Sequence, residues 1–214
     1  MWGEVMKTNK GLVDHCKKAL DEGWGYVWGT YGQVLTESRL RFKAVQYPGI
    51  FKAQKLEYIR KNYLNKRTAD CGGLIKSYLW WTGNDAVYTP ASDLSVDGMY
   101  QFSQENGEIS SLPEIPGLIV WHKGHVGVYE GAGGVIEARG TIYGVIRTKL
   151  SERPWTHWFK HNDIDYVQGD DVSDWARDAQ KWAMDKGISD GSRPRDIVTR
   201  EELWTMLYRL ETRR

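Results

Sequence analysis

The sequence predicts an α+β protein that ends in a small helical hairpin. Before Pro116, apolar residues recur at helical spacing. After Pro116, short segments rich in branched residues alternate with glycines, as is typical of antiparallel strands. Beyond Gly169, apolar residues return to helical spacing. Helices followed by a run of strands indicate an α+β domain. We therefore expect a main domain over residues 1–168 and a helical module over residues 169–214.

The main domain is expected to begin with four helices. Their predicted ranges are Asn9 to Gly23, Lys52 to Tyr63, Cys71 to Trp80 and Val96 to Gln104. Five strands are expected to follow, at Leu118 to Trp121, Val126 to Tyr129, Val135 to Ala138, Gly144 to Thr148 and Ile164 to Val167. Cys16 shares the apolar stripe of the first helix, so we expect it in the core rather than in a disulfide.

Composition excludes several classes of function. The chain of 214 residues carries 29 basic and 28 acidic residues that are spread along it, which argues against nucleic-acid binding. No apolar run is long enough to span a membrane. The first residues lack the apolar stretch of a secretory signal, so we expect synthesis in the cytoplasm.

A reactive thiol is predicted at the start of the third helix. Cys71 follows Asp70, which is placed as the N-cap, and precedes Gly72 and Gly73. The free N–H groups and the dipole of a helix N-terminus favour a thiolate, and the same N–H groups can stabilise an oxyanion. The two glycines leave room for a substrate backbone. We therefore expect Cys71 to be a nucleophile.

A histidine and a glutamate are predicted to meet across a hairpin. His125 begins one strand and Glu137 lies in the next, so a turn at residues 131–134 would set them opposite each other within about one position and on one face. Glu137 would then orient the imidazole of His125, the expected base. Gly127 is expected to leave room for the cysteine helix.

His122 raises the alternative of a metal site together with His125. Their odd spacing around Gly124 predicts opposite faces of a strand, and no further cluster of ligands accompanies them. We expect neither a metal nor a cofactor. A lone cysteine or histidine is most often structural. Here the coincidence of a helix start with a strand register favours catalysis.

Three segments resemble, in order, the sequence blocks of the NlpC/p60 cysteine peptidases. They are YVWG (Tyr26 to Gly29), DCGGL (Asp70 to Leu74) and HVGVYEG with VIEA (His125 to Ala138). The resemblance implies a papain-like core that cleaves bacterial cell-wall peptides, with Cys71 as nucleophile, His125 as base and Glu137 as the third member. It also implies that Tyr26 lines the site. We expect Tyr26, Asp70 and Gly72 to contact the substrate.

The chain departs from the family pattern at three places. Gly72 stands where serine is common, and in members that require a free N-terminal L-alanine this serine helps to hold the amine. We therefore expect attack on intact wall peptides. Glu137 stands where histidine is more frequent. The segment between Gly29 and Asp70 is long, and we expect it to form an extra wall of the cleft.

The C-terminal module is predicted to contain two helices. The first lies between Val172 and Gly187, and the second opens at Thr199, where Glu202 completes a capping box. The second helix is expected to bury a stripe of Leu203, Met206, Leu207 and Leu210. The tail resembles a single S-layer homology module, which implies that Arg200 binds an anionic wall polysaccharide. Packing or homo-oligomerisation through the module is an equal alternative.

Together these expectations describe a peptidoglycan hydrolase that works through a thioester, most specifically a D-γ-glutamyl-diamino acid endopeptidase. The missing signal favours a phage or prophage endolysin that reaches the bacterial cell wall after release. Two alternatives stay open. One is an N-acetylmuramoyl-L-alanine amidase with the same three residues, and the other is an inactive wall-binding module. Peptidoglycan is the expected partner in each case.

Overall fold

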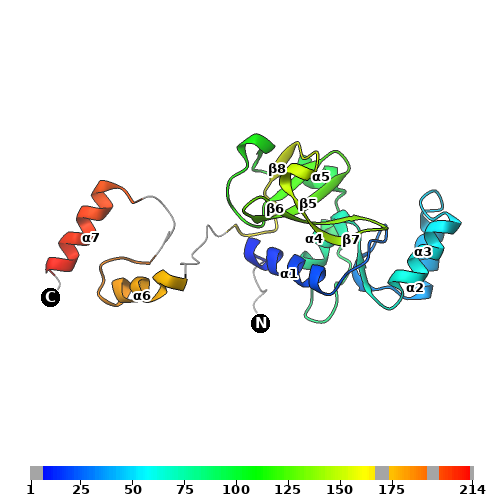
Figure 1. The fold of residues 1–214 in the computed structure, drawn as a ribbon, viewed down its shortest axis with the longest axis horizontal. Helices are drawn as coiled ribbons and strands as arrows, with labels where there is room; N and C mark the ends of the chain where they lie inside the picture. The colour runs from blue at the N-terminus through cyan, green and yellow to red at the C-terminus, as the bar shows by residue number, and fades with distance from the viewer. Residues whose placement is uncertain (1–6, 167–173, 192–197, 213–214) are drawn as a thin grey trace. The chain divides into compact units, whose positions relative to one another are not determined.

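The computed structural model describes residues 7–166, 174–191 and 198–212. The chain divides into two compact units, Met1–Tyr166 and Val167–Arg214. In the first unit, helices pack against an antiparallel sheet, which confirms the predicted α+β class (Figure 1). No helix within the described ranges combines the length and the apolarity needed to cross a membrane.

The sheet of the first unit has six strands in the order β3-β8-β4-β5-β6-β7, and all its neighbours are antiparallel. The strands are β3 (Asn106–Glu108), β4 (Ile119–His122), β5 (His125–Gly131), β6 (Gly134–Gly140), β7 (Gly144–Lys149) and β8 (His157–Phe159). Four of the five predicted strands are present. The prediction of a strand from Ile164 is wrong, because in this segment Asp165 forms only an isolated β-bridge with Thr8. Val167 lies outside the described residues.

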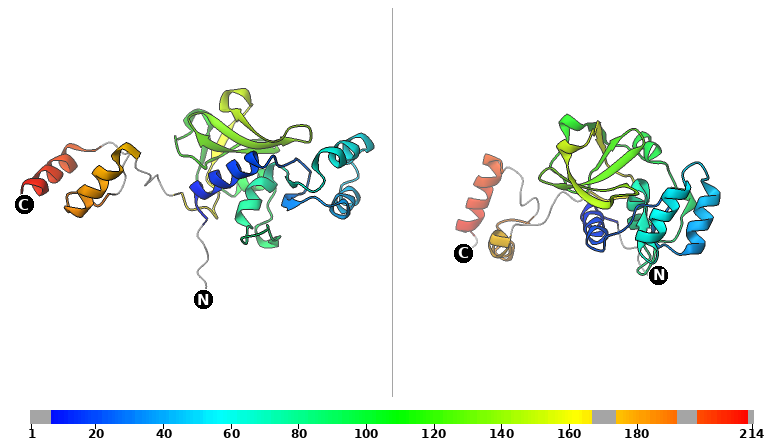
Figure 2. Two further views of the ribbon diagram at one scale, coloured as in Figure 1. Left: turned by 60° about the horizontal axis from the view of Figure 1, so that its bottom comes forward. Right: turned by 45° about the vertical axis from the view of Figure 1, so that its right-hand side comes forward.

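Two helices cover one face of this sheet, α1 (Asn9–Asp21) and α4 (Cys71–Leu79) (Figures 1 and 2). Their apolar side chains form the main core with inward-facing residues of β4 to β6, and Cys16 is fully buried there as expected. The short helix α5 (Val96–Gln101) also contributes to this core. A second cluster, which includes Val135 and Trp155, covers the opposite face.

An inserted segment forms a helical lobe beside the sheet (Figure 2). It contains α2 (Glu37–Gln46) and α3 (Ala53–Tyr63), which share a separate apolar cluster. Helix α2 was not predicted, because Leu40 is its single buried residue and its apolar spacing is therefore weak. The strands β1 (Tyr31–Val34) and β2 (Arg67–Ala69) flank the lobe and pair with each other.

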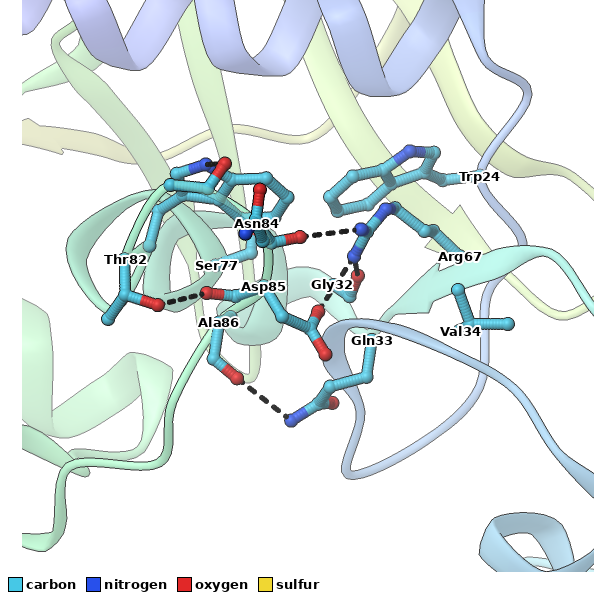
Figure 3. A network of polar contacts seen from close by, with 12 residues as sticks. Trp24, Gly32, Gln33, Val34, Arg67, Ser77, Thr82, Asn84, Asp85 and Ala86 are labelled. Carbon is cyan, nitrogen blue, oxygen red and sulfur yellow. Dashed lines mark hydrogen bonds and ion pairs between the residues drawn. The ribbon is translucent and has the colours of Figure 1, made fainter.

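Arg67 ties the small β1–β2 sheet to the loop that follows α4 (Figure 3). Its guanidinium donates to the carbonyl oxygen of Gly32 at 2.7 Å, to the carboxylate of Asp85 at 2.8 Å and to the carbonyl oxygen of Asn84 at 2.9 Å. Since β2 leads almost directly into α4, these hydrogen bonds help to fix the start of that helix.

The second unit contains α6 (Arg177–Asp185), preceded by a 3-10 turn, and α7 (Arg200–Thr212). The predicted capping box is present: the backbone N–H of Thr199 donates to Glu202 at 2.9 Å, and the N–H of Glu202 donates to the Thr199 hydroxyl at 3.2 Å. The predicted buried stripe is wrong. Leu203, Leu207 and Leu210 are 44%, 54% and 44% exposed. Two short helices offer too little surface to enclose such a stripe.

Candidate active site

Cys71 begins α4, and Asp70 ties this helix start to the preceding Tyr26–Gly29 loop. One carboxylate oxygen of Asp70 accepts the N–H of Gly73 at 2.6 Å, and the other accepts the N–H of Gly29 at 2.7 Å. The first of these bonds is the predicted N-cap. Asp70 thus joins two of the three sequence blocks through a single side chain. No pattern in the sequence predicts the second bond.

Gly73 allows the backbone of α4 to approach the backbone of Thr30. A Cβ atom at Gly73 would lie 1.9 Å from the carbonyl oxygen of Thr30, which is far inside van der Waals contact. The N–H of Asp70 donates to the same carbonyl at 3.0 Å. This close approach positions the loop that carries Tyr26 against the start of α4.

Tyr26 lies half-buried beside the nucleophile. Burial raises the pKa of its hydroxyl, and the negative charges that Cys71 and Asp70 carry when ionised raise it further. The phenol therefore stays protonated and can donate a hydrogen bond in the site. That Tyr26 lines the substrate site stays a prediction.

Burial disfavours ionisation of the Cys71 thiol. Burial raises its pKa to about 12 and the neighbouring Asp70 adds to the rise, whereas the backbone N–H groups of Gly72, Val126 and Cys71 lower it. Burial outweighs the stabilisation that the helix N-terminus offers to a thiolate. The N–H groups at the helix start thus favour the thiolate as expected, but their effect on the pKa is smaller than that of burial.

His125 and Glu137 are joined by a hydrogen bond, with 2.7 Å between Nε2 and Oε2. The pairs Val128↔Ile136 and Tyr129↔Val135 define the register, which when continued places Glu137 opposite Gly127. The two residues are therefore offset by two positions rather than one. Glu137 bridges this diagonal because its side chain is long enough to reach across it.

Glu137 is fully buried and is held as a carboxylate. Burial alone would raise its pKa, but hydrogen bonds from His125 and Thr148 and the charge of Arg153 lower the pKa overall. The Thr148 hydroxyl donates to Oε1 at 2.9 Å. Arg153 Nε lies 3.0 Å from the same oxygen, in an ion pair without hydrogen-bond geometry at that atom.

The ionised Glu137 fixes how His125 can act. A carboxylate can only accept, so Nε2 of His125 carries the proton and Nδ1 keeps its lone pair. Nδ1 is then the nitrogen that can receive a proton from a thiol. Sequence reasoning missed Thr148 and Arg153. Thr148 lies on a predicted strand, whereas Arg153 lies in a loop that carries no periodic signal.

The ring of His125 lies against Trp155, with ring centroids 5.7 Å apart and an interplanar angle of 13°. Gly127 makes this possible, since a Cβ atom there would lie 3.2 Å from the Trp155 ring and 2.6 Å from the Val135 side chain. Gly127 therefore faces Trp155. The expectation that it makes room for the cysteine helix is wrong.

His122 lies directly opposite His125 on the neighbouring strand β4, and their ring centroids are 5.4 Å apart. The expectation of opposite faces is wrong, because the turn at Lys123 and Gly124 separates two strands rather than interrupting one. Burial lowers the pKa of His122, and the nearby His125 lowers it further. In the described part of the chain, no three His, Cys, Asp or Glu residues are grouped to hold a metal ion.

The thiol of Cys71 lies near the start of β5. The N–H of Val126, the residue after His125, acts on the thiol. Among the described residues, no hydrogen bond joins the sulfur to the imidazole. Catalytic hydrogen bonds are often long without substrate and tighten when it binds. The arrangement supplies a buried thiol, a held imidazole and backbone N–H donors, which are the groups needed for acyl transfer.

The remaining predicted site residues lie in different surroundings. Gly72 is buried, and a Cβ atom there would lie 2.9 Å from a methyl group of Val96. A serine at this position would therefore press on α5. Arg200 is exposed in the first turn of α7, in the second unit.

No family model and no curated protein matches the chain. Among solved structures it is similar to NlpC2 from Trichomonas vaginalis, with 18% identity, a TM-score of 0.42, and coverage of 74% of this chain and 49% of the other. It is similar to the peptidoglycan hydrolase RipB from Mycobacterium tuberculosis, with 17% identity, a TM-score of 0.41, and coverage of 74% and 67%.

A third similar structure is the p60 domain of an antigen from M. avium subspecies paratuberculosis, with 21% identity, a TM-score of 0.42, and coverage of 74% and 98%. The chain spans about half the length of the Trichomonas proteins. These structural neighbours are NlpC/p60 proteins, and the chemistry of this site rests on its own residues.

Proposed function

We propose that this chain is a thiol-dependent peptidoglycan hydrolase. The observation that carries the proposal is the buried 2.7 Å hydrogen bond between His125 and Glu137. The N–H of Val126, the residue after His125, acts on the thiol of Cys71 at the start of α4. A buried carboxylate that holds an imidazole beside a thiol serves nucleophilic catalysis better than it serves stability. The wall-peptide substrate follows from the resemblance of the three sequence blocks.

The reaction proceeds in two stages. The Cys71 thiol passes its proton to Nδ1 of His125 while Sγ attacks the substrate carbonyl carbon, and backbone N–H groups at the start of α4 stabilise the oxyanion. The imidazolium gives its proton to the leaving amine, and a thioester to Cys71 remains. Water, activated by His125, then attacks the thioester, releasing the acid and restoring the thiol.

The proposed scissile bond is the D-γ-glutamyl link to the diamino acid. The proposed setting is a phage or prophage endolysin, made in the cytoplasm and acting on the wall after release. In this proposal residues 1–168 form the catalytic domain, and the module at residues 169–214 contributes either polysaccharide binding through Arg200 or self-association.

The test is digestion of purified peptidoglycan by the full chain, with mass spectrometry of the products. New diamino-acid amines are expected with the unmodified chain and none with Cys71→Ala. Cys16→Ala is the matched control, because Cys16 is a buried core residue, and this variant should retain activity. Release of intact sugar-free stem peptides would identify an amidase instead. Equal digestion by Cys71→Ala would refute the thiol mechanism, and no digestion by the unmodified chain would favour an inactive wall-binding module.

A further inference from the structure

A cavity of about 660 Å³ lies beside the start of α4 and is walled by the inserted helix α2. Asp70 and Gly73, which flank the nucleophile, contribute to its lining. The sequence-based expectation of an extra wall corresponds to this helix. Six aromatic side chains line the cavity, namely Trp28, Tyr31, Phe42, Tyr47, Trp80 and Tyr88.

Part of this aromatic lining is braced by ring contacts. Tyr31 and Trp80 meet edge to face with centroids 5.0 Å apart, and Trp80 and Tyr88 do the same at 5.5 Å. Tyr88 and Phe42 remain 49% and 65% exposed, so apolar surface is left for a ligand. Aromatic faces cover the apolar carbons of a ligand with little loss of side-chain entropy.

The charged side chains that line the cavity differ in whether they have a partner of opposite charge or a hydrogen-bond donor. Asp93 binds Lys76 and the Tyr88 hydroxyl, and Asp70 binds the two backbone N–H groups described above. Lys43 of α2 is different. Among the described residues, no carboxylate lies within ion-pair distance of its ammonium group.

Lys43 is held in place by uncharged groups, and the carboxylates of Asp70 and Asp93 act on it only from beyond ion-pair distance. Its Nζ donates to the side-chain oxygen of Gln46 at 3.1 Å and lies 5.7 Å and 5.8 Å from the ring centroids of Phe42 and Tyr47. It would lie 3.4 Å from a Cβ atom on Gly29, whose N–H binds Asp70. The ammonium thus projects toward the loop that Asp70 joins to the nucleophile.

We propose that this cavity is a substrate subsite for a carboxylate-bearing group, with Lys43 pairing with the carboxylate and the aromatic side chains covering the adjoining carbons. The inference rests on the proposed function and names the part of the substrate that the insert recognises. A half-buried ammonium binds a carboxylate more strongly than an exposed one, because solvent screens the pair less. In a stem peptide, the carboxylate can be the α-carboxylate of the D-glutamyl residue or the terminal carboxylate.

The test measures binding separately from cleavage, using the full chain with Cys71→Ala and a soluble disaccharide-peptide in isothermal titration. Adding Lys43→Met should weaken binding at least tenfold, and Lys43→Arg should retain most of it. Lys61→Met, on the exposed surface of α3, is the matched control and should have no effect. Thermal unfolding of each variant establishes that it is folded.

Two amidated ligands identify the source of the carboxylate. One carries an amide at the D-glutamyl α-carboxyl and the other at the terminal carboxyl, and the one that Lys43→Met no longer weakens names the group bound. Equal binding by the Lys43→Met and Lys61→Met chains would overturn the subsite, as would no binding by the parent chain. Binding that depends on Lys43, without cleavage by the unmodified chain, would refute the hydrolase and leave the subsite standing. Cleavage by the unmodified chain, together with binding that does not depend on Lys43, would support the hydrolase and refute the subsite.

Discussion

His125 and Glu137 form their hydrogen bond diagonally across β5 and β6, with 2.7 Å between Nε2 and Oε2. A diagonal pair leaves His125 at the first residue of its strand, beside the start of α4, while Glu137 sits fully buried between Thr148 and Arg153. The carboxylate is therefore fixed from the interior, and the imidazole is fixed by the carboxylate.

Glu137→Gln is expected to lower kcat/KM by about 10²–10⁴-fold, the order seen when an imidazole loses its orienting carboxylate. The amide keeps the shape of the side chain but removes the charge that holds the tautomer of His125. Steady-state kinetics on a soluble muropeptide measures the effect. Thr148→Val is the matched control, since it removes one hydrogen bond to the same carboxylate but leaves its charge and its bond to His125 in place, and it should cost clearly less than Glu137→Gln. Unchanged kinetics for Glu137→Gln would remove Glu137 from the mechanism.

Alkylation of Cys71 by iodoacetamide should be slow at neutral pH and should rise about tenfold per pH unit, because burial raises the pKa of the thiol to about 12. The thiolate fraction therefore grows throughout the neutral and mildly alkaline range. Peptide mass spectrometry separates Cys71 from Cys16, which burial should make less reactive still. A rate that is already constant near pH 7 would instead reveal a preformed thiolate–imidazolium pair.

Gly73→Ala should destabilise the first unit by about 3 kcal/mol, at the upper end of overpacking costs, because the new methyl group meets the backbone carbonyl of Thr30. Urea unfolding of the full chain measures the change. Gly49→Ala is the control: a Cβ atom there meets nothing within 4 Å, and the stability should change by less than about 0.5 kcal/mol. Equal stability of the two variants would contradict the close approach.

The first unit should lose stability as the pH falls from 6.5 toward 4, partly because of His15. Its Nε2 lies 2.7 Å from the Ser77 hydroxyl, and burial lowers the pKa from 6.5 to about 4. Between pH 6.5 and 4, His15 is protonated in the unfolded chain but stays neutral in the folded chain. The free energy of unfolding therefore falls as the pH falls. The loss attributable to His15 is about 3 kcal/mol.

His15→Gln is the comparison for this acid effect, because it removes the titrating group. Urea unfolding at pH 7 and pH 4 should show a smaller difference for the variant than for the unmodified chain. His122 and His161, whose pKa values are also lowered, are present in both proteins and cancel. An identical pH dependence in the two proteins would exclude His15 as a source.

Features with strong periodicity or a short-range motif were predictable from the sequence. The ranges of α1, α3 and α4, the strands β4 to β7 and the N-terminal cap of α7 at Thr199 follow local rules of this kind. Helix α2 escaped because Leu40 is its only buried residue. The Asp70–Gly29 hydrogen bond and the contact of Arg153 with Glu137 could not be predicted, because long-range contacts of loop residues produce no periodic pattern in the sequence.

The net effect on the Cys71 pKa was also beyond the sequence. A helix start can be recognised from Asp70 and two glycines, but the degree of burial depends on what the rest of the fold places over the sulfur. Burial raises the pKa of the thiol by more than the surrounding backbone N–H groups lower it. The place of Cys71 at a helix start was therefore easier to predict than the effect of burial on the pKa of its thiol.

The two-sided grip of Asp70 has a consequence for how the site can change. One carboxylate accepts N–H groups of both the Tyr26–Gly29 loop and α4. The loop and the start of the helix that carries Cys71 are therefore coupled and should move together. If the Tyr26–Gly29 loop were replaced by the loop of another enzyme, residue 70 would have to be chosen to match the new loop. Otherwise the new loop would lose its anchor and the helix start would be left with a carboxylate facing empty space. A change in this loop is thus expected to affect both substrate recognition and the position of Cys71. The inserted helices α2 and α3 can vary more freely, because they have a core of their own.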